Sequence, residues 1–273
     1  MTKDQLVAQI KLKKSFLCVG LDTDLRKVPT QYLHFDDPIF AFNRDVIEAT
    51  KDFAVAYKPN LAFYEKFGSR GWRSLEKTME IIPPDIFTIA DAKRGDIGNT
   101  ARMYAETFFE ELNFDAVTVN PLMGRDSVEP YLDFQDKWTI ILGLTSNSGA
   151  TDFQTLKLES GVLNYEQIMI TSSQWGNSNN TMFVVGATRP DQLAEIRKSF
   201  PEHFFLVPGV GAQGGTVEEV SRIGMNADVG LLINSSRGIL YAGKGEEAMV
   251  KVCESARLLQ QNMEMELFGH TKN

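Results

Sequence analysis

Residues 88–100, TIADAKRGDIGNT, run from apolar, strand-forming residues through an Asp-x-Lys-x-x-Asp pattern into a helix start. Residues two apart in an extended segment point to the same face, so Asp91 and Lys93 are expected side by side at the strand's end. Asp96 follows in the next loop. A lysine beside two carboxylates stays protonated and is poised to give up a proton. Taken alone, the pattern also fits a solvated ion pair at a strand end.

Similar apolar runs alternate with amphipathic helical patterns along the chain. Most of the runs are continuously apolar, which is typical of a parallel sheet covered by helices. Eight such repeats in 273 residues favour a single-domain (β/α)₈ TIM barrel spanning residues 1–273. An open doubly wound sheet is the alternative, but no GxGxxG follows the first strand. The expected strands are 16–21, 54–58, 87–92, 116–120, 139–144, 182–186, 204–207 and 229–233; the expected helices are 39–51, 69–82, 100–112, 189–199, 216–223 and 246–261.

The composition limits the classes of partner and the compartment. A net charge of −8 and a pI near 5.1 argue against nucleic-acid or anionic-membrane surfaces, but leave room for a local phosphate pocket. Cys18 and Cys253 lie in apolar patterns, as expected for buried thiols in a reducing compartment. The N-terminal segment lacks the apolar core of a secretory signal, and no run approaches the roughly 20 apolar residues of a membrane span. We therefore expect a cytoplasmic protein.

Polar residues gather at the carboxyl ends of the expected strands, where barrel active sites are built. Each could cap a helix or form a turn, but these roles do not explain why two lysines and two aspartates share this rim. The long connection at 146–181 carries Ser/Asn/Gly clusters, which suggest an extended loop over the barrel mouth. The strand-end residues are Asp22, Lys58–Pro59–Asn60, Asp91–Ala92–Lys93, Asn120–Pro121, Thr145–Ser146–Asn147, Ala187–Thr188–Arg189, Pro208–Gly209 and Asn234–Ser235.

The segment PGVGAQGG, residues 208–215, follows the seventh strand and precedes a helix that opens at Thr216. Its glycines allow backbone N–H groups to approach a ligand, and the helix start favours an anion. Arg237 follows the eighth strand and can grip a phosphate in bidentate fashion. The sequence therefore predicts a phosphate site here, with Gln213 able to bond both phosphate and a polar ligand edge.

Together these motifs resemble the orotidine 5′-phosphate decarboxylase family. The matching pieces are VGLD (19–22), Lys58, DAKRGDIGNT (91–100), PGVGAQGG (208–215) and SSRGI (235–239), in the family's order along nearly the whole chain. The chain length and the segments YKPNLAFYE, LTSNSGA and VGATRP are similar to the longer bacterial branch. The resemblance implies a carboxy-lyase that converts orotidine 5′-phosphate to UMP and CO₂ in pyrimidine synthesis. It also implies a homodimer with active sites at the interface and no metal or organic cofactor.

The resemblance further assigns roles to individual residues. Lys58, Asp91 and Lys93 form a charged array that Asp96 of the partner subunit joins. The ribose is contacted by Asp22 and Lys58, while Ile97 and Thr100 of the partner subunit complete that wall. The remaining substrate contacts are Ser127 on the pyrimidine, Gln213 with Gly214 between phosphate and pyrimidine, and Arg237 on the phosphate. His34, His203 and His270 match no catalytic role in the family.

Decarboxylation at C6 of orotate leaves a vinyl carbanion that the ring delocalises poorly. No electron-sink cofactor motif is visible, so the protein must supply the electrostatic stabilisation. Lys93 is expected to stabilise charge at C6 and then to protonate it. Schiff-base chemistry is disfavoured because Asp91 and Asp96 should keep the lysine charged.

Two other functions stay open from the sequence. A related barrel lyase acting on sugar phosphates shares Asp-x-Lys-x-x-Asp and uses Mg²⁺, but it carries a carboxylate where this chain has Lys58, and Gln213 favours a pyrimidine. A catalytically silent nucleotide-binding protein on the same scaffold has no need of the set Asp91, Lys93 and Asp96.

Overall fold

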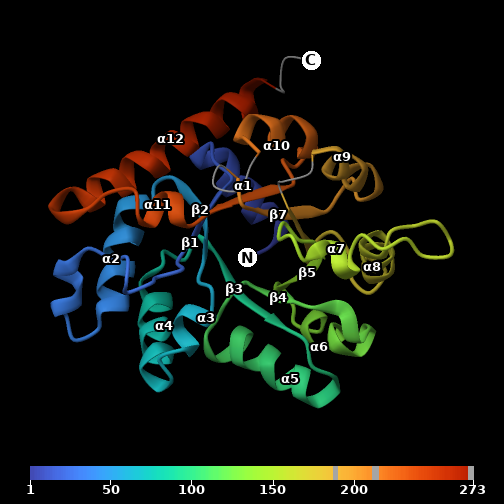
Figure 1. The fold of residues 1–273 in the computed structure, drawn as a ribbon, viewed down its shortest axis with the longest axis horizontal. Coiled ribbons are helices and arrows are strands. Elements are labelled where there is room, and N and C mark those ends of the chain that lie inside the picture. Colours follow the sequence, from blue (N-terminus) through green and yellow to red (C-terminus); the bar gives the residue numbers. More distant parts are fainter. Residues whose placement is uncertain (187–189, 211–214, 270–273) are drawn as a thin grey trace.

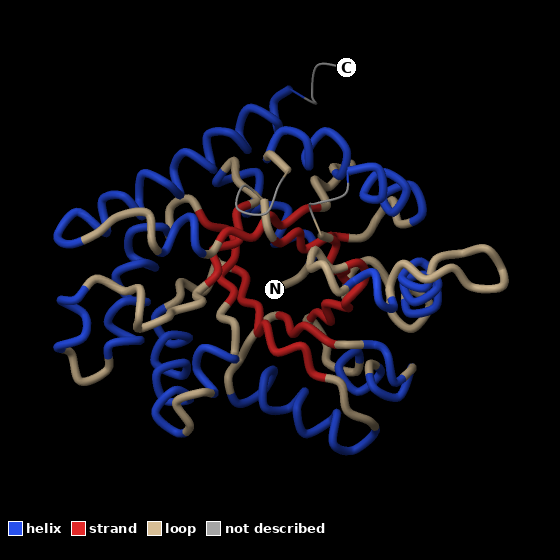
Figure 2. The backbone as a smooth tube through the Cα atoms, viewed as in Figure 1, coloured by secondary structure: helices blue, strands red, loops and turns tan. Residues whose placement is uncertain are grey.

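Eight parallel strands pair in sequence order, and β8 (Leu231–Ser235) closes the ring by pairing with β1 (Leu17–Gly20). The computed structural model describes residues 1–186, 190–210 and 215–269. Figure 2 shows the strands as a central ring with the helices outside it. The predicted (β/α)₈ barrel is therefore confirmed. The other strands are β2 (Ala54–Lys58), β3 (Phe87–Arg94), β4 (Ala116–Val119), β5 (Trp138–Leu144), β6 (Thr181–Val185) and β7 (Phe204–Pro208).

The outer helices begin at residues that suit helix starts. At α2, the Asp37 carboxylate accepts from the amide of Phe40, and Pro38 occupies the first turn. The α-helices are α1 (Lys3–Lys13), α2 (Pro38–Thr50), α3 (Ala62–Glu65), α4 (Ser69–Ile81), α5 (Gly98–Glu106), α6 (Glu129–Leu132), α7 (Ala150–Phe153), α8 (Asn164–Ser172), α9 (Pro190–Ser199), α10 (Val217–Gly224), α11 (Arg237–Leu240) and α12 (Ala248–Gly269). Short 3₁₀ or π-helical turns are η1 (Thr30–His34), η2 (Thr107–Glu111), η3 (Pro121–Met123), η4 (Arg125–Ser127) and η5 (Gly245–Glu247). No helix in the described ranges is long and apolar enough to cross a membrane.

The first helix lies against the amino end of the barrel. The Met1 ammonium group pairs with Asp115, just before β4, at 2.7 Å, and Trp138 Nε1 donates to the Met1 carbonyl at 2.8 Å. Lys13 Nζ donates to the carbonyl of Ala54 at the start of β2. In Figure 1 the N-terminus accordingly lies behind the centre of the ring. This end of the barrel is covered, so the opposite end is the one open to a ligand.

Aromatic side chains fill the barrel near its amino end. Trp138 is 1% exposed and meets Phe87 and Phe204 edge to face, with ring centroids 6.1 and 6.3 Å away. These residues come from β5, β3 and β7, and side chains from alternate strands form the layers of such a barrel. Edge-to-face contacts add to the stabilisation from apolar burial. The barrel is thus a packed core, and polar chemistry is left to its rim.

Three of the differences from the sequence-based expectation concern the strands and the connection at 146–181. The last strand begins at Leu231 rather than Val229, because Val229 and Gly230 have φ of 69° and 64° in a turn closed by Asn226. β3 continues past the expected end, through Lys93 to Arg94. The 146–181 connection is not an extended loop over the mouth. It forms α7 and α8, and the yellow-green loop before α8 points away from the barrel (Figure 1).

Candidate active site

A cavity of about 660 Å³ opens at the carboxyl ends of the strands. It brings together three predicted residues from successive strands, Asp22, Lys58 and Asp91, with Arg237 after β8. The other lining residues are Asn60, Ser146, Pro208, Gly209, Val210, Asn234, Ser235, Ser236, Gly238, Ser255, Leu258 and Leu259.

Two of the lining residues, Lys58 and Asp91, belong to a lysine–aspartate–lysine array whose third member is Lys93. Lys58 Nζ lies 2.8 Å from Asp91 Oδ2, and Lys93 Nζ lies 2.5 Å from Asp91 Oδ1. Lys58 is buried, whereas half of the Lys93 side chain is exposed. Each carboxylate oxygen of Asp91 therefore binds one ammonium group. The Lys93 ammonium group is the more exposed of the two, so it is the one that a ligand can reach.

Lys58 and Asp91 hold each other charged. Burial alone would raise the pKa of Asp91, but the adjacent Lys58 and Lys93 hold it well below its usual range. Burial would lower the pKa of Lys58, but Asp91 and Asp22 raise it above its ordinary value. Burial raises the pKa of the neighbouring Cys18 thiol to about 12, so this thiol stays neutral. The site presents fixed charges and no nucleophilic thiolate.

Asp22 supplies an unused acceptor at the cavity wall. Its Oδ1 is buried and has no hydrogen-bond partner among the described residues. Its backbone is held in place by Tyr241, whose hydroxyl donates to the Asp22 carbonyl at 2.9 Å. A buried acceptor without a partner is costly, and a ligand hydroxyl at this wall would satisfy it.

The adjacent wall is formed by the loops after β7 and β8, since β8 pairs with β1. Gly209 and Gly215 have φ of 88° and 80°, which favour glycine, and the Thr216 hydroxyl caps α10. Arg237 is exposed at the start of α11, and its guanidinium group has no hydrogen-bond or ion-pair partner in the parts of the chain that the structure describes. Gly20 allows the Ser236 loop to approach, since a Cβ there would lie 1.9 Å from Ser236 Oγ. Gln213 and Gly214, both predicted to bind substrate, lie outside the described residues.

Five other predicted residues do not line this cavity. Lys93 is one of them, although it pairs with the lining residue Asp91. Asp96 accepts from the amide of Ile97 at 2.8 Å rather than joining the array. Ile97 and Thr100, at the start of α5, are exposed to solvent. Ser127 is fully buried, and its hydroxyl donates to the Gly124 carbonyl at 2.6 Å.

The cavity also contains polar residues to which sequence reasoning gave no role. Ser146 lines it after β5, and Gly186 permits this position because a Cβ there would lie 2.9 Å from the Ser146 amide nitrogen. Asn234 lines it from β8 and donates to Ser236 Oγ at 3.3 Å. Both were named among the strand-end residues in the sequence analysis, but that position alone did not indicate a role for either.

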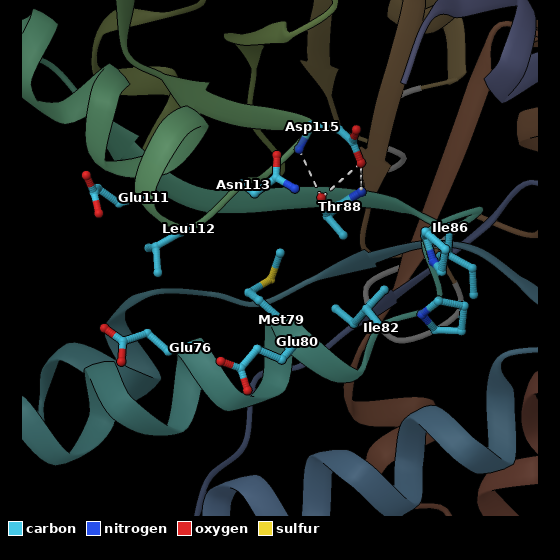
Figure 3. Close-up of a pocket in the computed structure, with 12 residues that line it drawn as sticks. Glu76, Met79, Glu80, Ile82, Ile86, Thr88, Glu111, Leu112, Asn113 and Asp115 are labelled. Carbon is cyan, nitrogen blue, oxygen red and sulfur yellow. Dashed lines mark hydrogen bonds between the residues drawn. The ribbon is translucent and has the colours of Figure 1, made fainter.

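A second cavity, of about 610 Å³, lies at the other end of the barrel. Figure 3 shows its walls, with Met79 and Glu80 from α4 facing Thr88 and Asp115, which hydrogen bond to each other. Thr88 is at the amino end of β3 and Asp115 precedes β4. This cavity is remote from the charged array and includes none of the predicted site residues.

Comparisons with known proteins find relatives that match this chain along nearly its whole length. The sequence model of the "Orotidine 5'-phosphate decarboxylase / HUMPS family" matches residues 15–252. The orotidine 5′-phosphate decarboxylase of Flavobacterium johnsoniae is 58% identical over 96% of this chain and 97% of its own, and that of Christiangramia forsetii is 57% identical over 98% and 99%. The structure of Leishmania donovani OMP decarboxylase superposes with a TM-score of 0.80 at 36% identity, covering 96% of this chain and 99% of that one. The chain belongs to the orotidine 5′-phosphate decarboxylase family.

Proposed function

We propose that this protein decarboxylates orotidine 5′-phosphate to UMP and CO₂ in pyrimidine biosynthesis. The observation that carries the proposal is the Lys58–Asp91–Lys93 array, two of whose members, Lys58 and Asp91, line the cavity that Arg237 also lines. The bond from C6 to the carboxylate breaks, its electron pair stays at C6, and CO₂ leaves. The Lys93 ammonium stabilises that charge, gives its proton to C6, and is reprotonated from solvent.

Different walls of the cavity bind different parts of the substrate. Arg237 and the loop after β7, with Gln213 and Gly214, take the phosphate, while Asp22 and Lys58 take the ribose hydroxyls. Asp22 suits this role because its unpartnered Oδ1 needs a donor. For the pyrimidine, the resemblance implies Ser127, but its hydroxyl is buried against Gly124. We assign that contact to Ser146, which lines the cavity.

We further propose that the active unit is a homodimer in which Asp96, Ile97 and Thr100 complete the site of the partner subunit. Within its own chain Asp96 does not reach the array, which leaves it available to a second chain. Apolar side chains around it are exposed: Ile97 by 50% and Leu122, in the loop after the neighbouring strand β4, by 77%. Burial of such surface is the main favourable term in association.

A cytoplasmic location is part of the proposal. The thiols of Cys18 and Cys253 are both free, as is usual in a reducing compartment. The small-molecule substrate and the net charge of −8 favour neither a nucleic-acid nor a membrane partner.

Purified protein is expected to release CO₂ from orotidine 5′-phosphate at the same rate with and without EDTA. Both oxygens of Asp91 already bind ammonium groups, and the positive charge of Lys58 and Lys93 opposes a divalent cation at that place. The measurement is CO₂ release or UMP formation after chelation and dialysis. Loss of activity that Mg²⁺ or Zn²⁺ restores would favour the metal-dependent sugar-phosphate lyase, and UMP binding without turnover would favour the silent binder.

Arg237→Ala is expected to lower kcat/KM. The corresponding activation free energy should rise by about 2–4 kcal/mol, the scale of a lost charge-assisted phosphate contact. Part of this loss should appear in kcat, because the phosphate is remote from C6 and its binding energy helps to organise the site where the reaction occurs. Steady-state kinetics should show it, with Lys198→Ala, a surface lysine paired with Glu195 on α9, as control. Equal values of kcat/KM in Arg237→Ala and wild type would contradict the assignment of Arg237 to the phosphate site.

A further inference from the structure

The carboxyl end of β3 departs from a regular strand at the lysine of the array. Lys93 has a φ of 47°, in the left-handed region that residues with a side chain rarely adopt. The ladder with β4 pairs Ala90 with Val117 and then Arg94 with Val119, so residues 91–93 lie opposite the single residue Thr118. Such bulges occur beside active sites, where they redirect a side chain. A strained backbone persists only when its surroundings fix it.

Thr118 supplies the contacts that the bulge removes from the ladder. Its hydroxyl accepts from the Lys93 amide at 2.9 Å and donates to Asp91 Oδ1 at 3.1 Å. That oxygen is the one that binds Lys93 Nζ. Thr118 is 1% exposed, so no solvent can replace its hydroxyl. One buried hydroxyl thus joins the backbone of the lysine to the carboxylate that holds its ammonium group.

The ladder resumes just beyond the bulge. The amide of Asn120 donates to the Arg94 carbonyl at 2.7 Å, and the Arg94 guanidinium pairs with Glu65 and lies 5.0 Å from the centroid of the Tyr104 ring. The Arg94 flank of the bulge is therefore fixed by neighbouring elements. Across the ladder from the bulge, the hydroxyl of Thr118 accepts the hydrogen bond from the Lys93 amide.

We propose that Thr118 is a positioning residue for decarboxylation, because its hydroxyl fixes the left-handed backbone of Lys93 and the orientation of the Asp91 carboxylate together. The inference rests on the proposed role of Lys93 as proton donor. It deepens that role by naming the group on β4 that sets where the ammonium stands. Misplacement of a reacting group by about 1 Å can cost about 100-fold in rate.

Thr118→Val keeps the shape of the side chain and removes the hydroxyl. We expect kcat to fall about 10- to 100-fold, while KM and the affinity for UMP stay within about twofold because the cavity walls that bind phosphate and ribose are untouched. Thr118→Ser, which restores the hydroxyl, should return kcat to within a few-fold of wild type. Amide hydrogen exchange at Lys93 should be faster in Thr118→Val than in Thr118→Ser, because the N–H loses its acceptor.

The chain offers a matched control in Thr139→Val on the next strand, β5. Thr139 is equally buried, and its hydroxyl oxygen has no hydrogen-bond partner among the described residues. The same chemical change there should leave kcat unaltered. If Thr118→Val does not fold, as judged by thermal unfolding, Thr118→Ala replaces it in the same comparison.

The outcomes separate this inference from the proposed function. If Lys93→Ala retains wild-type turnover, the proposed role of the lysine fails first. Suppose that Lys93→Ala is inactive. If Thr118→Val then keeps kcat within twofold of wild type, or is altered in KM alone, the role of Thr118 is overturned. An equal loss in Thr118→Ser and Thr118→Val overturns it as well.

Discussion

Lys93→Ala is expected to lower kcat for orotidine 5′-phosphate by about 10⁴-fold or more and to leave UMP binding measurable. The substitution removes a positioned proton donor, worth about 10²–10⁴-fold. It also removes a preorganised positive charge at the atom where negative charge develops, worth about 10²–10³-fold. The phosphate contact at Arg237 and the ribose contact at Asp22 remain, so product affinity should survive. Single-turnover kinetics and UMP titration measure the two quantities separately.

Two further variants sharpen this test. Lys93→Arg keeps a positive charge but cannot give up a proton at neutral pH, so it should also be nearly inactive if proton transfer matters. Lys66→Ala, at an exposed lysine after α3, should behave as wild type. Retention of more than a tenth of wild-type kcat in Lys93→Ala would contradict its role as proton donor.

Mixing inactive Lys93→Ala with inactive Asp96→Ala is expected to restore activity once the subunits exchange. If Asp96 serves the partner's site, a heterodimer contains one site with both lesions and one with neither. Random exchange makes half of the dimers heterodimers, so recovery should approach about a quarter of wild-type activity per total site, as expected for an isologous two-fold dimer. The position of Asp96, bonded to the Ile97 amide and not to the array, is the structural motive.

A matched mixture provides the control for this complementation. Lys93 and Asp91 belong to one array within one chain, so a heterodimer of Lys93→Ala and Asp91→Ala has a lesion in each site and should stay inactive. Native mass spectrometry of isotope-labelled chains would demonstrate the exchange. Exchange without recovery in the Asp96 mixture would mean that Asp96 acts within its own chain.

The sequence was sufficient for features that depend on local pattern. Nearly continuous apolar runs such as β4 and β6 are buried along their whole length, and this pattern predicted the barrel. The place of Asp22, Lys58 and Asp91 at one rim follows, because parallel strands align their carboxyl ends. Their convergence could therefore be predicted before any coordinates.

Features that depend on contacts between distant segments could not be predicted in this way. Val229 is β-branched and typical of a strand, yet it lies in a left-handed turn closed by Asn226. The simple two-residue alternation places Lys93 beside Asp91 but does not reveal the bulge, which depends on Thr118 across the ladder. Ser127 was matched by resemblance alone, and its burial against Gly124 becomes visible only in three dimensions.

The seam between β1 and β8 has a kinetic consequence. It pairs Leu17 with Ile233, from opposite ends of the sequence, so closing it involves the largest loop-closure entropy of any strand pair in the ring. Contacts so distant along the chain slow folding. Asp22 and Arg237 flank this seam, and the cavity between them exists only after it closes. During refolding from denaturant, recovery of enzyme turnover should therefore lag behind the recovery of helical circular dichroism, and the part of that lag that does not depend on protein concentration reports the time needed to close the ring.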